Sequence, residues 1–256
     1  MQVVDLSFEE FGSAQAEPLV ILHGFFASSR NWRQVAETLS TDFHVYVIDM
    51  RNHGASPHYA HMDYPVMTAD LLHFIDKHRL SSVNLLGHSM GGKIAMWFAL
   101  NHPERLNKLI VADIAPVSYQ HSFDDLINAL KALPLAEITN RKQAELWLAD
   151  AIPELSYRQF LLQNLVLTGS GYAWRVDLDI FLQAAPDITA FPETANLSPY
   201  QGQCLFLAGE HSHFIKVDAV NKLFPKAEIK VIAAAGHWLH VQQPLAFTES
   251  VAKFLR

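Results

Sequence analysis

The sequence predicts an α/β protein with a mostly parallel β-sheet, helices on both faces, and a helical segment inserted late in the chain. Six short apolar runs are continuous rather than alternating, as in strands that are buried on both faces. Helical patterns fall between most of these runs, and such alternation favours parallel strands joined by helical crossovers. The 256 residues, 50% of them apolar, are enough for one large core.

The predicted elements follow one another along the chain. The buried strands cover residues 19–22, 44–48, 82–86, 108–112, 204–208 and 228–232. The helices that alternate with them cover residues 31–39, 65–78, 91–101, 217–223 and 244–255. Residues 2–8 alternate between apolar and polar instead, which predicts an antiparallel edge strand paired with part of residues 9–18.

The alternation of strand and helix stops between residues 115 and 192. This stretch has helical periodicity over residues 123–133, 141–151, 157–167 and 176–185, with Pro and Gly between the helices. The chain returns to the sheet afterwards. We therefore predict an all-helical lid at residues 116–189, inserted in a core of residues 1–115 and 190–256, rather than a separate helical domain.

The segment Gly87-His88-Ser89-Met90-Gly91 fits the pattern G-x-S-x-G. It joins an apolar strand to a helix, and this sharp turn is typical of a nucleophile elbow, in which a strained serine lifts its hydroxyl above the sheet. Glycine is needed two residues before and after the serine because side chains there would collide. We interpret Ser89 as a nucleophile. A cap on the following helix is its alternative role.

Candidate partners for a nucleophile lie just past other predicted strands, where functional groups gather in parallel sheets. His237 is the candidate base, in a loop that can reach back to the serine. Asp113 directly follows a strand and is the preferred acid, with Glu210 and Asp218 as alternatives. Ser212 stands where an acid is often found in such folds. The order Ser, Asp, His along the chain is the order found in folds that contain this nucleophile elbow.

The backbone near the first buried strand predicts an oxyanion hole. We expect its donors to be the amides of Met90, which follows the nucleophile, and of Phe25. Gly24 lets the backbone come close to a substrate. Phe25, Phe26 and Trp238 are candidate substrate-binding residues, with core packing as the alternative for Phe26.

Two nearby polar segments are predicted to support this site. We expect His23 to orient the loop that carries the oxyanion donor rather than to transfer protons. Residues 49–56 suit a tight polar turn beneath the site. A direct contact of Arg51 or His53 with substrate is the alternative.

Composition excludes several classes of function. The formal net charge is −7 and no basic run occurs, which argues against nucleic acid and anionic membrane surfaces as partners. The longest apolar run, residues 94–100, is far shorter than the roughly 20 residues that span a bilayer. The N-terminus lacks a signal-peptide pattern, and Cys204 is the only cysteine. We expect a cytoplasmic protein without an internal disulfide.

The 14 histidines do not form a metal-binding pattern. Clusters occur at His53, His58 and His61 and at His211 and His213, but without H-E-x-x-H or paired cysteines. We therefore expect neither a metal nor another cofactor, and read most of these histidines as surface or loop residues.

Five segments carry a resemblance to a known family. They are residues 22–25 (LHGF), 87–93 (GHSMGGK), 111–116 (VADIAP), 209–212 (GEHS) and 236–238 (GHW). Over essentially its whole length the chain resembles the α/β-hydrolase superfamily, and more closely the YbfF-type carboxylesterases and their mitochondrial relatives. The resemblance implies a triad of Ser89, Asp113 and His237, with Phe25 and Met90 as oxyanion donors. It also implies hydrolysis of carboxylic esters, with acyl thioesters as a further class.

The sequence thus predicts a serine hydrolase that cleaves esters of short to medium acyl chains through an acyl-enzyme. An acyl-CoA thioesterase and a carbon–carbon bond hydrolase are alternatives on the same scaffold. The thioesterase requires a cationic patch at the lid mouth, for which Arg30, Arg33, Lys93 and Arg141 are candidates. A ligand-binding protein that has kept the scaffold is the alternative from another class.

Overall fold

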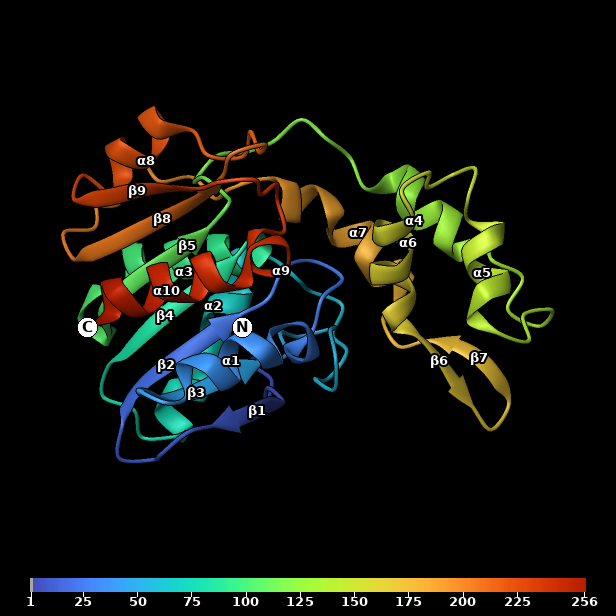
Figure 1. Cartoon of the computed structure of the whole chain (residues 1–256), viewed down its shortest axis with the longest axis horizontal. Coiled ribbons are helices and arrows are strands. Elements are labelled where there is room, and N and C mark those ends of the chain that lie inside the picture. Colours follow the sequence, from blue (N-terminus) through green and yellow to red (C-terminus); the bar gives the residue numbers. More distant parts are fainter. Residues whose placement is uncertain (1) are drawn as a thin grey trace.

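A seven-stranded sheet forms the centre of the computed structural model, which describes residues 2–256 (Figure 1). The strand order is β1-β3-β2-β4-β5-β8-β9, and every pair except β1–β3 is parallel. The strands are β1 (Phe8–Phe11), β2 (Glu17–Leu22), β3 (Phe43–Ile48), β4 (Val83–His88), β5 (Leu106–Ala112), β8 (Gln203–Gly209) and β9 (Ala227–Ile232). The predicted fold class is confirmed, and each of the six apolar runs overlaps one of the parallel strands.

The expected edge strand at residues 2–8 is wrong in position and partner. Strand β1 covers Phe8–Phe11 and pairs antiparallel with β3, not with residues 9–18. The alternating residues that precede it are extended but unpaired in the sheet. Val4 and Leu6 are buried in the core, and Val4 N donates to Asp70 Oδ1 at 2.9 Å. The apolar residues alternate here because Val4 and Leu6 anchor the segment in the core. A period of two alone does not distinguish such an anchored segment from a strand.

Two apolar layers, one on each face of the sheet, hold the core helices in place. Alternate residues of β2 point into opposite layers, Leu19 and Ile21 into one and Val20 and Leu22 into the other. The first layer holds α1 (Arg33–Leu39) and α10 (Pro244–Leu255), and the second holds α2 (Tyr64–Lys77), α3 (Met90–Asn101) and α8 (Val217–Leu223). Continuous apolar runs in the strands follow from this double coverage.

Residues 116–189, which we call the insertion, lie between β5 and β8 in the chain and extend beyond the carboxyl ends of the sheet strands (Figure 1). The insertion contains α4 (Asp124–Lys131), α5 (Arg141–Trp147), α6 (Leu155–Leu161), a short turn η3 (Leu162–Asn164) and α7 (Leu178–Thr189). It also contains a hairpin of β6 (Leu165–Thr168) and β7 (Gly171–Trp174).

The all-helical expectation for the insertion is therefore wrong at residues 165–174. The predicted helix over residues 157–167 ends early, at Leu161, and a hairpin follows it. Gly171, with a φ of 113°, closes the tight turn of this hairpin. The flanking residues are rich in β-branched and aromatic side chains, which favour strands. Helix α7 also runs four residues further than predicted, with Pro186 inside it.

Two features are absent from the residues that the structure describes. No helix within residues 2–256 is long and apolar enough to cross a membrane. The same part of the chain contains no group of three or more His, Cys, Asp or Glu placed to hold a metal ion. Cys204 is buried, and burial raises the pKa of its thiol to about 12, so the thiol stays protonated and unreactive.

Candidate active site

Ser89 lies in a sharp turn between β4 and α3, with a φ of 53° and a ψ of −116°. This strained conformation costs roughly 1–3 kcal/mol and is sustained by the packing around it. A Cβ atom on Gly87 would lie 2.2 Å from Gly91 O, and one on Gly91 would lie 2.3 Å from Leu22 O. Only glycine fits at these two positions, because the backbone of Gly91 lies against Gly87 and the backbone of Leu22 lies against Gly91. The spacing of G-x-S-x-G follows from these two close contacts.

The side chains of Ser89, His237 and Asp113 form one hydrogen-bonded chain. His237 Nδ1 lies 2.7 Å from Asp113 Oδ2, and His237 Nε2 lies 3.1 Å from Ser89 Oγ. Because an ionised carboxylate only accepts, Nδ1 carries the imidazole proton and Nε2 presents its lone pair to the serine hydroxyl. The three residues come from the ends of β4, β5 and β9, and the structure brings all three together.

The carboxylate of Asp113 is fully buried and has three donors. Besides His237, Gly209 N donates to Oδ1 at 2.9 Å and Ser212 Oγ donates to Oδ2. Of the alternative acids, Glu210 instead accepts from Ala234 N at 2.7 Å. Asp218 lies on α8, and in the described chain neither of these two hydrogen-bonds to His237. The geometry favours Asp113 as the partner of the histidine.

Phe25 and Met90, the predicted oxyanion donors, line the same cavity as Ser89 and His237. Met90 N lies at the start of α3, where the first N–H groups of a helix have no partner inside it. Across residues 2–256, no protein acceptor is recorded for either amide, whereas the neighbouring Phe26 N donates to His53 Nε2 at 3.3 Å. At Gly24, a Cβ atom would lie 3.4 Å from the Cβ of Ser89, so the backbone passes close to the nucleophile.

His23 and His53 stabilise the loops beneath the site. His23 Nδ1 donates to Gly24 O at 2.8 Å, and its Nε2 accepts from Met50 N at 3.0 Å. His53 Nδ1 donates to Arg51 O at 2.9 Å. Burial lowers the pKa of both histidines, which keeps them neutral. Neither His53 nor Arg51 lines the pocket, and Arg51 forms a buried ion pair with Asp70, so residues 49–56 support the site as expected.

Two further buried histidines lie beside the candidate base, and sequence reasoning did not identify them. His88 Nε2 donates to His237 O at 2.8 Å, and His240 stacks on Trp32 with ring centroids 4.2 Å apart. Burial lowers the pKa of His88 well below its ordinary value and that of His240 to about 3. Both rings are therefore neutral, so they add no positive charge beside His237 when it takes a proton.

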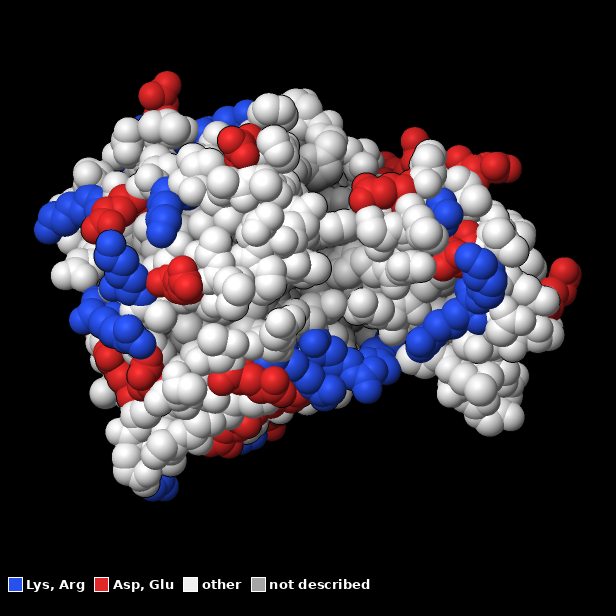
Figure 2. All heavy atoms as spheres, viewed as in Figure 1, with Lys and Arg blue, Asp and Glu red and all other residues white. Residues whose placement is uncertain are grey.

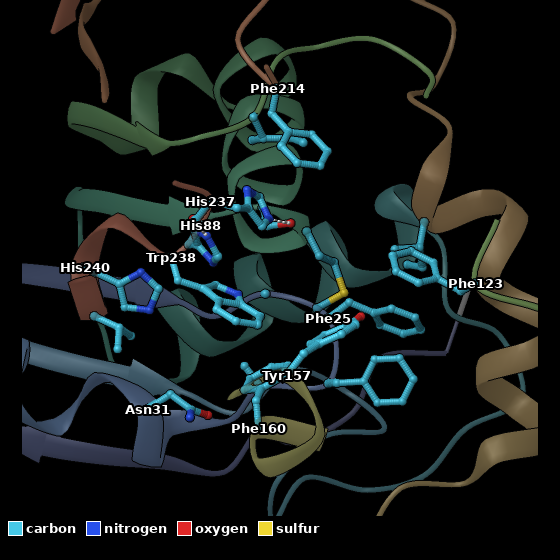
Figure 3. A pocket seen from close by; sticks show the side chains of 18 of the residues that line it. Phe25, Asn31, His88, Phe123, Tyr157, Phe160, Phe214, His237, Trp238 and His240 are labelled. Atoms are coloured by element: carbon cyan, nitrogen blue, oxygen red, sulfur yellow. Dashed lines mark hydrogen bonds between the residues drawn. The ribbon is translucent and has the colours of Figure 1, made fainter. Parts of the chain in front are cut away.

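The triad opens into a pocket of about 660 Å³ between the sheet and the insertion. Phe25, Phe26 and Trp238, the candidate substrate-binding residues, all line it. Further aromatic residues from the insertion and from the loop after β8 also line it, among them Phe123, Tyr157, Phe160 and Phe214 (Figure 3). Sequence patterns did not single these four out, because they do not show which face of an inserted helix meets the core.

Contacts between aromatic rings join the insertion to the core over the pocket. Trp238 lies 5.5 Å from Tyr157 and 5.3 Å from Phe160, both on α6. On the other side, Phe25 stacks on Phe181 of α7 at 4.6 Å. These contacts place residues from both parts of the chain around the same apolar space.

Lys93 is buried in α3 and lines the pocket, but it shares no cleft with Arg30 and Arg141. Its ammonium donates to Thr189 O at 2.8 Å and to Ala190 O at 2.6 Å, at the carboxyl end of α7. The expected place of Lys93 in a cationic patch is therefore wrong: the lysine holds a helix end whose carbonyls need donors. Arg33 is also engaged, in an ion pair with Glu9 at 2.6 Å.

A strained serine, a histidine and an aspartate in the loops that follow three strands of this parallel sheet define an α/β hydrolase. A family model described as alpha/beta hydrolase fold matches residues 17–244, and the chain belongs to this family.

Named relatives cover nearly the whole chain. It is 39% identical to the sn-1-specific diacylglycerol lipase ABHD11 of Xenopus tropicalis, over 99% of this chain and 83% of the relative. It is 32% identical to esterase YbfF of Escherichia coli, over 93% of this chain and 92% of the relative. A solved structure described as a marine microorganism esterase has 40% identity and a TM-score of 0.93, covering 98% of this chain and 99% of that one.

Proposed function

We propose that this protein is a serine esterase that cleaves carboxylic esters of short to medium acyl chains without a cofactor. The hydrogen-bonded chain from Ser89 through His237 to Asp113 is the observation that carries the proposal. Relatives named as an esterase and a diacylglycerol lipase, which span most of both chains, support ester bonds as the target.

In the first half of the reaction, Ser89 Oγ attacks the ester carbonyl and passes its proton to His237 Nε2. Asp113 stabilises the resulting imidazolium through Nδ1 and keeps the ring oriented. The amides of Phe25 and Met90 donate to the oxyanion, where each such donor contributes roughly 10²–10³ in rate. The tetrahedral intermediate then releases the alcohol, which takes the proton from Nε2, and leaves an acyl group on Ser89.

In the second half, water takes the place of the alcohol. His237 Nε2 accepts a proton from the water, whose oxygen attacks the acyl carbonyl within the same oxyanion hole. Collapse of this second intermediate returns the proton to Ser89 Oγ and releases the acid. Phe25, Phe26 and Trp238 contact the bound substrate in this proposal, because they line the pocket beside the nucleophile.

The insertion, residues 116–189, acts as a lid in the same proposal. Contacts of Tyr157 and Phe160 with Trp238, the neighbour of the base, support this role. An apolar pocket of about 660 Å³ suits a ligand of modest size, and the insertion over it limits the access of water to the reaction. Thioester and carbon–carbon bond hydrolysis would use the same side chains, and substrate comparison separates them from ester hydrolysis.

The test is hydrolysis of p-nitrophenyl butyrate by the wild-type protein and by Ser89→Ala, with Ser170→Ala at the exposed hairpin tip as the matched control. We expect turnover by the wild type and the control, and a loss of at least 10³-fold in Ser89→Ala. A fluorophosphonate probe should label the wild type and fail to label Ser89→Ala. Normal turnover by folded Ser89→Ala would refute the proposal, and an unlabelled, inactive wild type would favour a ligand-binding role.

A further inference from the structure

A second cleft, of about 260 Å³, adjoins the active-site pocket. Three arginines line it: Arg30 from the short helix η1 (Ser29–Trp32), Arg141 from the start of α5, and Arg175 just after β7. We call the space that these three arginines line the arginine cleft. Figure 2 shows Lys and Arg side chains gathered where the sheet-containing part of the molecule meets the insertion.

The arginine cleft lies directly beside the pocket that contains Ser89. Phe26, Asn31 and Gln163 line both spaces. Cross-contacts fix the boundary between them: Asn31 Nδ2 donates to Gln163 Oε1 at 2.8 Å, and Asn164 Nδ2 donates to Phe26 O at 2.8 Å. A substrate that extends from Ser89 into the cleft passes between these boundary side chains, which belong to polar or aromatic residues at the rim of the two spaces.

The charges of the arginine cleft are not neutralised by the protein. No acidic residue lines it, and none of the three arginines forms a salt bridge within residues 2–256. Arg141 donates through Nε and Nη2 to Leu165 O, at 3.2 and 2.9 Å, which fixes its guanidinium on β6. In a chain with a net charge of −7, three such guanidinium groups in one cleft make a local site for an anion.

We propose that the arginine cleft binds a phosphate group carried by the substrate, on the side of the scissile bond away from the buried acyl pocket. The inference rests on the proposed function and names the class of substrate more closely. Planar guanidinium groups bind phosphate through paired N–H donors, and three of them match a doubly charged anion better than a single carboxylate. The apolar pocket then holds the acyl chain, and the arginine cleft selects the leaving group.

The test compares substrates with and without phosphate, and in the coenzyme A pair the phosphates come together with an adenosine. One pair is monobutyrin and 1-butyryl-glycerol 3-phosphate, and the other is butyryl-pantetheine and butyryl-coenzyme A. In the wild type we expect kcat/KM to be at least ten-fold higher for the phosphorylated member of at least one pair. The pair that shows the preference identifies the source of the phosphate, a glycerol phosphate or a nucleotide thioester.

Variants test whether the arginine cleft causes the higher kcat/KM for the phosphorylated substrates. In the double variant Arg30→Gln/Arg175→Gln the preference should fall to about one-fold, while turnover of the uncharged members stays unchanged. The matched control is Arg33→Gln, which removes an arginine already paired with Glu9 and should keep the preference. A preference that survives the double variant, or its absence from both pairs in an active wild type, would overturn the inference and leave the esterase proposal intact.

A binding measurement keeps the two proposals separate. Calorimetry on Ser89→Ala, which cannot turn the substrate over, should show that 1-butyryl-glycerol 3-phosphate or butyryl-coenzyme A binds at least ten-fold more tightly than its uncharged partner. The difference should shrink as salt rises, because the arginines are partly open to solvent. Equal affinities within both pairs would contradict the arginine cleft, even if the wild type proved inactive on every ester.

Discussion

Ser212 Oγ donates a hydrogen bond to Asp113 Oδ2, the same oxygen that lies 2.7 Å from His237 Nδ1. Ser212 follows β8, at a place where this class of fold often has its acid, and here it contacts an acid that follows β5. The serine therefore belongs to the site as a positioning residue. Its hydroxyl donates to the carboxylate oxygen that also contacts the imidazole.

Replacing Ser212 with alanine should lower kcat for p-nitrophenyl butyrate roughly ten-fold with little change in KM. One hydrogen bond to a charged group is worth about 1.5–3 kcal/mol, and only part of that acts on the transition state. Ser212→Thr, which keeps the hydroxyl, should retain most of the rate. Steady-state kinetics check this result, and an equal loss in Ser212→Thr and Ser212→Ala would assign the residue to packing alone.

Replacing Asp113 with asparagine should lower kcat about 10⁴-fold, because an amide no longer holds the tautomer that presents a lone pair to Ser89. Glu210→Gln is the matched control and should keep its activity, since Glu210 contacts Ala234 rather than His237. Both rates are measured on proteins with matching circular dichroism spectra. A larger loss in Glu210→Gln than in Asp113→Asn would move the acid to the loop after β8.

Alanine at Gly87 should destabilise the protein by about 3 kcal/mol or more, because its Cβ would lie 2.2 Å from Gly91 O within a rigid turn. Gly169→Ala, in the hairpin between β6 and β7, is the control, since nothing lies within 4 Å of that Cβ. Thermal unfolding gives the comparison. Similar unfolding temperatures for both variants would show that the elbow has more room than its geometry indicates.

Stability should rise with pH through Lys93. Burial lowers the pKa of Lys93 in the folded protein from 10.5 to about 7. Between these values the unfolded chain binds more protons, so the group favours folding as the pH rises, by at most about 1.4 kcal/mol per pH unit. Below about pH 7 both states are protonated and the effect ends.

Lys93→Met lacks this group and provides the comparison. The free energy of unfolding of the wild type minus that of Lys93→Met should increase between pH 7 and pH 10 in urea titrations. Lys93 also lies beside the Tyr119 ring, but burial raises the pKa of Tyr119 to about 12, so that phenol stays neutral over this range. Parallel pH curves for the two proteins would show that Lys93 keeps its proton in the folded state.

The parallel strands were predictable because each is buried on both faces and therefore appears as an unbroken apolar run. The triad was predictable for a related reason, since residues at the ends of such strands meet at one edge of the sheet. The β6–β7 hairpin was missed because residues 165–167 also continue the helical periodicity of α6. Position along the chain did not reveal Ser212, His88 or the aromatic residues of the insertion, whose roles depend on which side chains face one another after folding.

The hydroxyl of Ser89 and the imidazole of His237 meet across 148 positions of the chain. A ribosome makes the nucleophile long before it makes the base, and the imidazole arrives only when the final edge strand, β9, has joined the sheet. A nascent or partly unravelled molecule thus carries an inert serine. In the proposed mechanism, turnover begins only once the carboxyl-terminal fifth of the protein is docked, so hydrolysis in a cell extract would report completed folding.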